Sequence, residues 1–545
     1  MTDILTADVV VVGSGVAGAL LAATLAEAGV AVLILEAGAD VDRNQAVRHF
    51  QQALVKVPEC AYPTTPQAMH PVSDQPGAWY VQAGPTAFQS TYLKVVGGTT
   101  WHWLGSCPRF LPSDFAMQSR FGRAVDWPLS YDTLEPDYLA AERELGVSGS
   151  DDDPLGSPRS GPYPMPAIPP TYLDRRLAAA LQDSPYHVRA TPQARNSQFH
   201  NLRPPCCGSA SCIPVCPIGA KYDATVHVRR AQAAGARLLS QATVVRLEAD
   251  AEGRIQTLSC RRWDGSVQQV QGRIVVLAAN AIETPRLLLA SRSARYPQGL
   301  ANQSDQVGRN LMDHPVQLSW ALAKAPVYPY RGPLSTSGIE NLRDGEVRRQ
   351  RSAFRIEIGN DGWSWPVGAP ASTVEQLIAE GVVGAELDAR LAHLAARHVR
   401  LASLTEQEPD PDNRVTLDPV LVDPYGVPRP RLHYRLDAYA TDGLAAARAA
   451  HDDIFSRLGV SESHHAPEFF GAGHILGTTR MGRDPRQSVV DATLRSHDHP
   501  NLYLVGGGVF PTVGTANPTL TIAALSLRAA AAIQAQLRGS GLSMG

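Results

Sequence analysis

The chain contains 545 residues, of which 44% are hydrophobic and 19% charged, and its formal net charge is −3. These are ordinary values for a globular protein, and the length predicts two or more subdomains because single cores stop growing well below it. The charge gives no reason to expect a nucleic-acid partner. No run of about 18 apolar residues is unbroken and residues 1–5 carry no basic region, so neither a membrane span nor a secretory signal is predicted.

The clearest unit in chain order covers residues 7–35, where an apolar β-branched run, a glycine turn, an alanine-rich helix and a second apolar run predict β-α-β with a buried parallel sheet. Residues 201–219 are rich in Pro, Gly and Cys and predict a loop. Residues 274–279 predict another buried strand, with a helix following over about 283–291. Near the end, residues 502–505 predict a strand and residues 519–537 a long alanine-rich helix.

Two long stretches, from about 110 to 235 and from about 320 to 465, lack the β-α-β pattern and carry many prolines. We therefore predict a two-domain α/β protein. The first domain, which contains the β-α-β unit, is expected to be discontinuous and to combine three segments, residues 1–110, 236–320 and 466–545. The second domain is expected to combine two segments, residues 111–235 and 321–465.

A glycine motif, Gly13-Ser14-Gly15-Val16-Ala17-Gly18, follows the first predicted strand and opens the first helix. The first glycine permits a tight turn, the second lets the backbone approach a pyrophosphate, and the third allows close packing. Glu36 ends the second strand, where a carboxylate can accept hydrogen bonds from a ribose. The pattern predicts a dinucleotide site rather than a tight turn without a ligand, and by itself it does not decide between FAD and NAD.

Three C-terminal motifs resemble those of the glucose–methanol–choline (GMC) oxidoreductase family, whose members are FAD enzymes. They are residues 474–482 (HILGTTRMG), 501–508 (NLYLVGGG) and 516–521 (ANPTLT), and residues 95–103 and 307–315 support them. The resemblance runs from about residue 7 to about 535 and thins between 325 and 465. It implies a Rossmann-type FAD-binding domain and a substrate domain with an antiparallel sheet that covers the flavin ring.

The resemblance also implies which residues contact the FAD. Besides the glycine motif and Glu36, we expect contacts from Gly97, Gly98, Thr99, His102, Val244, Ala279, Gly507, Asn517 and Thr519. The histidine that matches His102 in pyranose oxidases is bonded covalently to the flavin. Because Trp101 precedes it here in place of a threonine, both a covalent bond and a histidine that merely lines the flavin stay open.

Two residues are predicted to act on the substrate. Alcohol oxidation needs a group that accepts the hydroxyl proton, and histidine suits this role because its unperturbed pKa is about 6.5. His474 lies at the position of the catalytic base in the family motif. Asn517 falls where the family has a second histidine or an asparagine, and its amide can hold the substrate oxygen. Its structural alternative is an N-cap of the helix that follows.

Four of the seven cysteines fall within one loop, Cys206, Cys207, Cys212 and Cys216. Adjacent cysteines make a poor chelating pair for zinc, whereas an iron–sulfur cluster accepts thiolates from one compact loop and often ends in Cys-Pro. The residues alone leave a cluster, a zinc site and disulfides open.

The cysteine spacing, followed by residues 218–220 (IGA), is similar to that in the catalytic subunits of bacterial membrane-bound FAD glucose dehydrogenases and their gluconate, 2-ketogluconate, fructose and sorbitol counterparts. The resemblance implies a [3Fe–4S] cluster on Cys206, Cys212 and Cys216. It also implies a small subunit that carries the export signal, a multihaem cytochrome c and a position at the periplasmic face of the inner membrane. The expected activity is dehydrogenation of a sugar or polyol such as glucose or gluconate.

Two rival functions remain open. One is a soluble, cytoplasmic flavoenzyme of pyranose-oxidase or glycoside 3-dehydrogenase type that uses oxygen or another acceptor. The other is a non-catalytic flavoprotein, which the presence of both His474 and Asn517 disfavours. The substrate itself is not readable from the sequence, because Trp363 and Trp365 could stack on a sugar ring or belong to the core.

Overall fold

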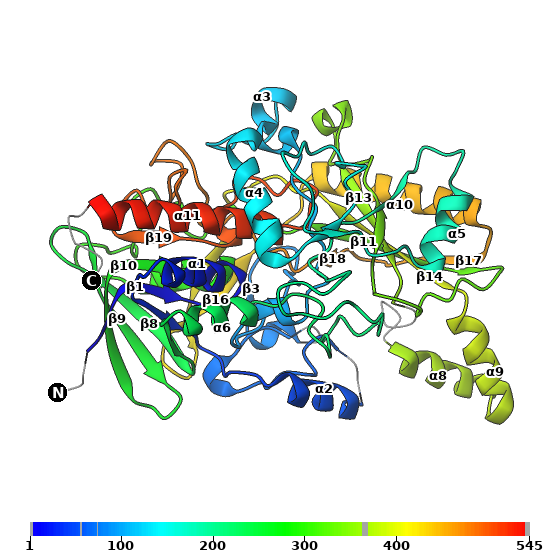
Figure 1. Cartoon of the computed structure of the whole chain (residues 1–545), viewed down its shortest axis with the longest axis horizontal. Helices are drawn as coiled ribbons and strands as arrows, with labels where there is room; N and C mark the ends of the chain where they lie inside the picture. The colour runs from blue at the N-terminus through cyan, green and yellow to red at the C-terminus, as the bar shows by residue number, and fades with distance from the viewer. Residues whose placement is uncertain (1–3, 55–56, 73–74, 362–368, 540–545) are drawn as a thin grey trace.

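A computed structural model describes residues 4–54, 57–72, 75–361 and 369–539 of the chain (Figure 1). Trp363 and Trp365, for which a sugar-stacking role is open, lie outside the described residues. Two seven-stranded sheets occupy different halves of the protein, and each draws its strands from distant parts of the chain. Segments far apart in sequence therefore meet where the two halves join.

The first sheet contains the predicted β-α-β unit. β1 (Leu5–Val12) and β2 (Val32–Leu35) pair in parallel and are joined by α1 (Val16–Glu27), the crossover helix that parallel strands require. The strand order is β7-β2-β1-β10-β9-β8, with β19 beside β10. The further strands are β7 (Arg237–Leu239), β8 (Ala242–Ala249), β9 (Ile255–Arg262), β10 (Val267–Leu277) and β19 (Leu502–Leu504).

The predicted helix after β10 begins earlier than its sequence pattern indicates. α7 covers Asn280–Ala290, and the side-chain oxygen of Asn280 accepts the backbone N–H groups of Ile282 and Glu283. Asn280 has a φ of 71°, which asparagine tolerates better than most residues. This capping starts the helix three residues before the apolar periodicity becomes visible.

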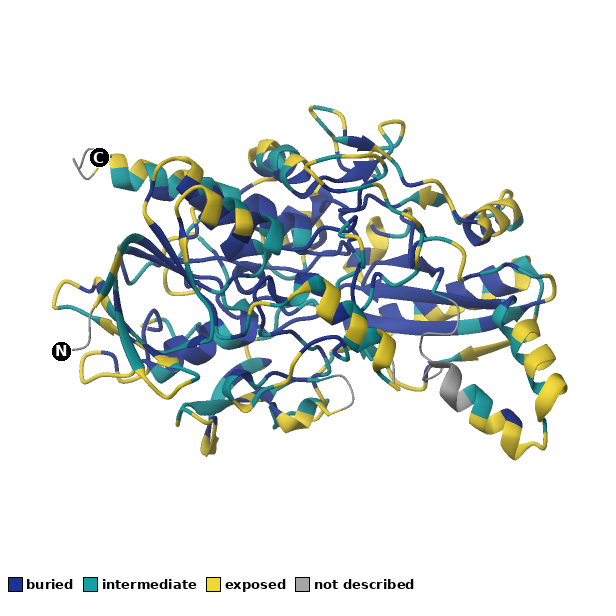
Figure 2. Cartoon of the chain, turned by 60° about the horizontal axis from the view of Figure 1, so that its bottom comes forward, coloured by how far each residue is buried: buried dark blue, intermediate teal, exposed yellow. Residues whose placement is uncertain are grey.

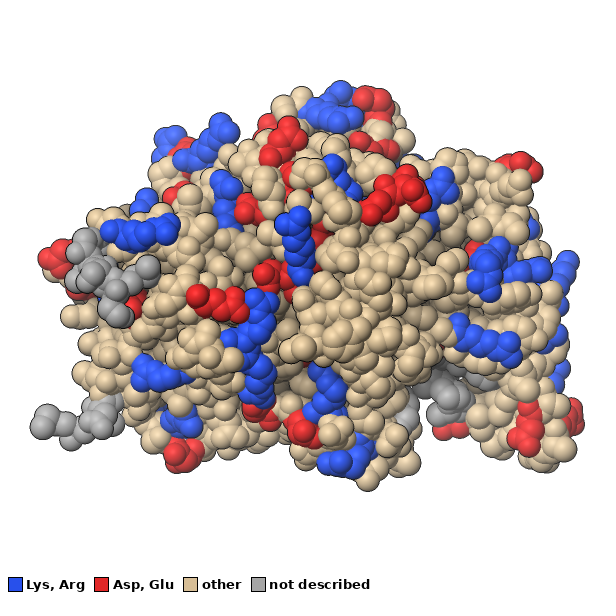
Figure 3. All heavy atoms as spheres, in the orientation of Figure 1, with Lys and Arg blue, Asp and Glu red and all other residues tan. Residues whose placement is uncertain are grey.

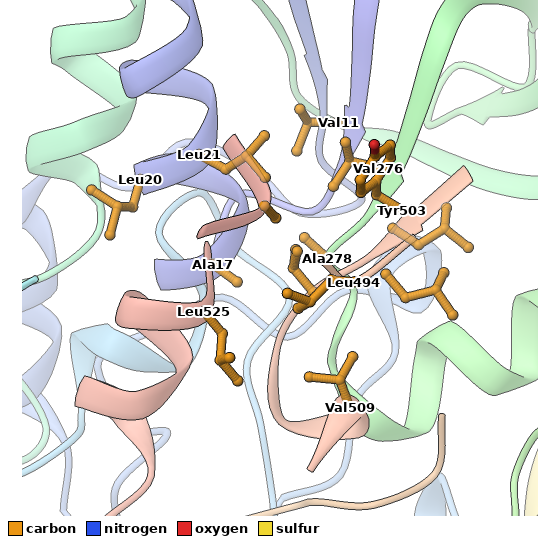
Figure 4. Packing of buried hydrophobic residues seen from close by; sticks show 14 of the residues in the cluster. Val11, Ala17, Leu20, Leu21, Val276, Ala278, Leu494, Tyr503, Val509 and Leu525 are labelled. Carbon is orange, nitrogen blue, oxygen red and sulfur yellow. The ribbon is translucent and has the colours of Figure 1, made fainter. Parts of the chain in front are cut away.

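The core of this half lies between the first sheet and the helices α1 and α11 (Thr519–Gly539). Val11 and Val276 from the sheet and Leu525 from α11 are fully buried there (Figure 4). Each such side chain contributes about 1.5–3 kcal/mol relative to an exposed one. Among the described helices, only α11 is long and apolar enough to cross a membrane, but it packs along α1 and α4 (Tyr131–Leu145), as a core helix does.

The second sheet is antiparallel, as the family resemblance predicts, with the order β17-β11-β14-β13-β12-β6 and β18 beside β11. Helix α10 (Ala438–Leu458) packs against β11 and β14. The predicted boundary at residue 320 falls inside β11, so this strand belongs to the second sheet from its first residue. The strands are β6 (Val188–Ala190), β11 (Pro315–Ala323), β12 (Ser337–Ile339), β13 (Phe354–Gly359), β14 (His398–Thr405), β17 (Val460–His465) and β18 (Phe470–Gly471).

Smaller elements complete the fold. Helices α8 (Ala369–Ala379) and α9 (Gly384–Ala395) lie at the edge of the molecule (Figure 1). Helix α9 has no buried residue, and exposed residues are concentrated at the periphery of the protein (Figure 2). The remaining helices are α2 (Arg43–Gln52), α3 (Met117–Phe121), α5 (Tyr172–Ala180) and α6 (Thr225–Ala233). The remaining strands are β3 (Val81–Gln82), β15 (Arg414–Val422) and β16 (Pro428–His433), which form one sheet, and β4 (Ser148–Gly149) and β5 (Met165–Pro166), which pair with each other.

Candidate active site

The three glycines of the turn at residues 13–18 differ in their surroundings, as the motif predicts: one permits the tight turn, one leaves the backbone open and one allows close packing. Gly13 has a φ of +103°, and a Cβ atom there would lie 2.5 Å from the carbonyl oxygen of Ala278. A Cβ atom on Gly18 would lie 2.1 Å from the carbonyl oxygen of Gly13. A Cβ atom on Gly15 would meet no protein atom within 4 Å. Gly15 therefore leaves its backbone open toward a ligand, while Gly13 and Gly18 serve the turn itself.

A pocket opens at this turn and brings together several of the predicted nucleotide contacts. The carboxylate of Glu36 accepts the Ser14 hydroxyl at 2.7 Å and the Gly38 N–H at 2.9 Å, and burial raises the pKa of Glu36. A carboxylate offers more acceptor sites than these bonds use, so Glu36 can still accept from a ribose. The predicted residues that line the pocket are Gly13, Gly15, Glu36, Gly98, Thr99, Val244 and Ala279.

The same pocket has an ionic network that the sequence motifs do not indicate. Lys94 lies 3.0 Å from Glu283, which also pairs with Arg286, and Arg286 pairs with Asp423 at 2.6 Å. Burial raises the pKa of Glu283, but Lys94 and Arg286 outweigh it and lower that pKa to about 2. These four charges come from three separate segments, the loop at Lys94, helix α7 and the loop at Asp423, so only the fold places them beside the glycine turn.

The second predicted flavin segment is a short turn, Gly98–Trp101, that ends at His102. Its backbone approaches the glycine turn closely, since a Cβ atom on Gly98 would lie 3.2 Å from the Cα atom of Gly15 and Gly97 N–H donates to the Ser14 hydroxyl. His102 is half-buried, and its buried Nε2 atom has no hydrogen-bond partner among the described residues. Burial, with a contribution from Lys221, lowers the pKa of His102 to about 3. A neutral, unpartnered imidazole nitrogen of this kind fits a histidine that faces a flavin.

The predicted base, His474, is held by a carboxylate and a second histidine. Its backbone N–H donates to Asp313 at 3.0 Å, and its Nδ1 atom lies 3.0 Å from Nδ1 of His314. Burial, then the proximity of His314 and Arg355, lowers the pKa of His474 well below 6.5. His474 is therefore neutral near pH 7, the state in which an imidazole can accept a proton.

The predicted partner, Asn517, contacts charged residues of β13 through both polar atoms of its amide. Its Oδ1 accepts from Arg355 Nη1 at 2.6 Å, and its Nδ2 donates to Glu357 at 3.3 Å. Arg355 also pairs with Glu340 at 2.6 Å and is completely buried. Because Arg355 acts electrostatically on His474 and bonds Asn517, the structure brings the predicted pair to one place. Both polar atoms of the Asn517 amide contact β13, and its function toward a substrate stays a prediction.

Arg355 and Glu357 have no motif in the sequence. One signal is nevertheless present, because charged residues alternate with apolar ones through β13, Phe354–Gly359, and a period of two places them on one face of the strand. His314 and Asp313 lie inside the family motif at residues 307–315, which by itself gives them no function.

The other predicted contacts lie beside these elements rather than in the pocket lining. Gly507 packs against the His474 loop, where its Cβ atom would lie 2.5 Å from the carbonyl oxygen of Ile475. Thr519 is the first residue of α11, two residues after Asn517. Val16 and Ala17 form the first turn of α1, whose N–H groups are suited to bind phosphate.

The cysteine loop has no helix or strand between Asn201 and Gly219, as predicted. All seven cysteines of the chain are described and none forms a disulfide, so the disulfide alternative is wrong. Cys212 and Cys216 are buried, Cys206 is half-buried and Cys207 is exposed. Backbone N–H groups of Gly208 and Lys221 donate to the sulfurs of Cys206 and Cys216, each at 3.4 Å, and the Arg195 guanidinium donates to Cys212 at 3.2 Å.

The three predicted ligands are close enough to affect one another. Burial raises the pKa of the Cys206 thiol, and the nearby Cys212 and Cys216 add to this rise. No group of three His, Cys, Asp or Glu side chains in the described parts of the chain is placed so that it could hold a metal ion. The structure therefore gives no support of its own to a zinc site, and the cluster on Cys206, Cys212 and Cys216 stays a prediction.

Lys221 connects the cysteine loop to the turn at His102. Its backbone N–H donates to the sulfur of Cys216, while its Nζ donates to the carbonyl oxygens of Trp101 at 2.8 Å and Trp103 at 2.6 Å. Burial lowers the pKa of Lys221 to about 8, although Cys212 and Cys216 oppose the shift. One side chain therefore spans the predicted flavin and cluster sites.

Comparison with known proteins places these features in one family. Two family models described as GMC oxidoreductase match residues 173–316 and 409–526, and one described as NAD(P)-binding Rossmann-like domain matches residues 11–81. The chain is 39% identical to the fructose dehydrogenase large subunit of Gluconobacter japonicus, over 98% of this chain and 99% of that protein. It is 25% identical to the gluconate 2-dehydrogenase flavoprotein of Pantoea cypripedii, over 97% and 94% of the two chains.

A solved structure has the same fold. Pyridoxine 4-oxidase from Mesorbium loti gives a TM-score of 0.62 at 20% identity, and the similarity covers 97% of this chain and 99% of that one. The fold and the comparisons define a flavoenzyme, an FAD-dependent oxidoreductase that acts on CH–OH groups. The chain belongs to the GMC oxidoreductase family, as its separated motifs predict.

Proposed function

We propose that the protein is an FAD-dependent sugar or polyol dehydrogenase that passes its electrons through a [3Fe–4S] cluster to a cytochrome partner. The single observation that carries the proposal is the bridge made by Lys221, whose backbone contacts the cysteine loop and whose side chain contacts the residues on both sides of His102. The end-to-end similarity to a fructose dehydrogenase large subunit supports a sugar substrate and a partner subunit.

The catalytic step follows from the environment of two residues. Oxidation of the alcohol removes a proton from oxygen and a hydride from carbon and leaves a carbonyl. His474 accepts the proton, because its low pKa keeps the ring neutral. Asn517 holds the substrate oxygen, since Arg355 occupies its carbonyl and Glu357 only one of its two N–H groups. FAD, when bound, supplies the acceptor for the hydride.

Hydrogen bonds to the cysteine sulfurs support the proposed cluster. Cys206, Cys212 and Cys216 would hold it, and the donors to their sulfurs, together with the cation of Lys221, stabilise thiolate charge. The chemistry that a cluster supplies is one-electron transfer, which suits onward delivery to another protein. Cys207 is exposed and is not required as a ligand.

The surface beside this loop is suited to a protein partner. Residues 204–220 contain no charged side chain, and Ile218 within this stretch is 41% exposed. Phe199 and Leu202, just before it, are 67% and 92% exposed. In Figure 3 the middle of this face, where Figure 1 shows the blue-green coil to the right of α6, is largely free of charge. An apolar, uncharged surface at an electron exit supports docking of a small subunit and a multihaem cytochrome c.

The proposed location is the periplasmic face of the inner membrane, with export on a partner subunit's signal. Fractionation of cells that express the chain with and without the partner tests it. Co-expression should move the protein to the periplasmic membrane fraction, and recovery only from the cytoplasm in both cases would contradict the proposal.

Iron and acid-labile sulfide analysis, with turnover assays, tests the function. We expect about three irons per chain and sugar-dependent reduction of an artificial dye that exceeds oxygen consumption. Cys212→Ser should lose the cluster but keep flavin, whereas Cys207→Ser, its matched control, should keep both. Iron-free protein with full oxidase activity would contradict the proposal. His474→Ala with bound flavin and full dye-linked turnover would contradict the catalytic assignment.

A second candidate is a flavoenzyme of pyranose-oxidase or glycoside 3-dehydrogenase type that uses oxygen or another acceptor. The observation in its favour is the unpartnered Nε2 atom of His102, which suits a covalent bond to flavin. Acid precipitation distinguishes the two states of the flavin. Yellow colour that stays with the denatured protein and disappears in His102→Ala indicates a covalent bond, and colour released into the supernatant indicates none.

A further inference from the structure

We propose that His314 is a positioning residue that fixes the tautomer of His474 and thereby makes Nε2 of His474 the atom that accepts the substrate proton. The inference rests on the proposed function of His474. It adds a residue to which neither the family motif nor the comparisons assign a function, and it specifies which of the two nitrogens of the base reacts.

The chain of hydrogen bonds has one consistent direction. His314 Nε2 lies 3.0 Å from the carbonyl oxygen of Gly514, which can only accept, so this nitrogen carries a hydrogen. In a neutral imidazole the other nitrogen is then an acceptor. Nδ1 of His314 lies 3.0 Å from Nδ1 of His474, so His474 must donate from Nδ1. The lone pair of His474 is left on Nε2.

His314 accepts from His474 only while its own ring is neutral, and the surroundings of His314 keep it so. The side chain is completely buried, and burial, opposed by the Gly514 carbonyl and reinforced by Arg355 and Arg343, lowers the pKa of His314 to about 4. A protonated His314 would present a hydrogen to Nδ1 of His474 and force the proton of His474 onto Nε2. The base would then have no lone pair for the substrate.

The orientation of the His314 ring is itself determined. A flip of 180° would place carbon atoms opposite both the Gly514 carbonyl and His474, and would remove two buried hydrogen bonds. The carboxylate of Asp313 accepts the backbone N–H of His314 at 2.7 Å and that of His474 at 3.0 Å. One carboxylate therefore holds both residues, and their rings meet nearly perpendicularly, with an interplanar angle of 89°.

Two substitutions separate this role from simple filling of space. His314→Asn puts an amide oxygen near the position of Nδ1, where it can still accept from His474. His314→Gln puts its amide near the position of Nε2, where it can donate to Gly514 but leaves His474 Nδ1 without an acceptor. We expect dye-linked kcat/KM of the Asn variant to exceed that of the Gln variant by about 10-fold or more, the effect of one buried hydrogen bond to a reacting group. Equal activities in two variants with wild-type flavin content would overturn the proposal.

Nitrogen-15 NMR of histidine-labelled holoenzyme reads the tautomer without relying on turnover. The His474 signals are assigned by their loss in His474→Asn, and we expect them to report Nδ1–H in the wild-type protein. A wild-type His474 that carries its proton on Nε2 would overturn the proposal even if both His314 variants fail to fold. Full activity of His474→Ala would instead show that His474 is not the base, but it would not change the tautomer measured in the wild-type protein. Failure of the proposed function and failure of this inference are therefore distinguishable.

Discussion

Alanine substitutions in the glycine turn should separate binding of FAD from stability of the fold. Gly15 has φ −66° and ψ −176°, which any residue adopts, and a Cβ atom there meets no protein atom within 4 Å. Gly15→Ala should therefore change the unfolding free energy of the apoprotein by less than about 1 kcal/mol. Its methyl group would instead occupy the space that the backbone leaves for the pyrophosphate.

The expected loss of FAD affinity follows from the cost of overpacking. An extra methyl group in a well-packed contact costs about 1–3 kcal/mol, which corresponds to a roughly 5- to 150-fold weaker Kd. Gly18→Ala should behave differently, because its Cβ atom would lie 2.1 Å from the Gly13 carbonyl oxygen and must displace the turn. This second variant should lose both stability and FAD.

Flavin fluorescence titration of apoprotein and thermal unfolding of the same samples provide the assay. Gly77→Ala is the matched control, because a Cβ atom on Gly77 also meets nothing within 4 Å and Gly77 does not line the pocket. If FAD is covalently bound, flavin content per purified chain replaces the titration. Gly15→Ala that binds FAD as well as Gly77→Ala would refute the reasoning, and so would Gly15→Ala that unfolds as easily as Gly18→Ala.

Three further predictions concern the reaction and the electron path. Because the pKa of His474 is lowered, the ring is protonated and loses its lone pair only well below pH 6.5. A plot of kcat/KM against pH should therefore stay flat through pH 6.5 and fall only at more acidic pH. An acid limb of kcat/KM with its midpoint at or above pH 6.5 would contradict this. Asn517→Asp replaces an N–H donor with an acceptor beside Glu357 and should lower kcat/KM by about 10- to 100-fold with flavin still bound; unchanged kinetics would exclude its role. Lys221→Met removes a buried cation near Cys216. Because a nearby cation favours the reduced cluster, the variant should have a more negative reduction potential in an EPR-monitored redox titration. An unchanged potential would show that Lys221 has no electrostatic effect on the cluster.

Much of the fold and part of the site could be predicted from local sequence. The β-α-β unit, the loop at residues 201–219 and the closing helix each depend on periodicity or turn residues that lie close together in the chain. The glycines of the turn are similarly local, because their conformations and contacts follow from a strand that turns directly into a helix. The exact start of α7 was missed because a single asparagine cap, rather than an apolar pattern, sets it.

The ionic and histidine networks could not be predicted in this way. Lys94 and Glu283 are 189 positions apart, and Arg355 and Asn517 are 162 positions apart, so neither pairing has a local pattern. Buried charges need partners, but the sequence does not indicate which of the many charged residues provides them. Only the packed structure selects them.

The sequence by itself indicated the chemistry of this protein. The turn glycines and the clustered cysteines are recognisable from residue type and spacing, and His474 from its place in a motif that resembles the GMC family. The tertiary structure decided how that chemistry is oriented. It placed His314 against His474, Arg355 against Asn517 and Lys221 between the two predicted redox sites. The physical reason is that a hydrogen bond depends on positions and directions of atoms, and these are set only when distant segments pack together.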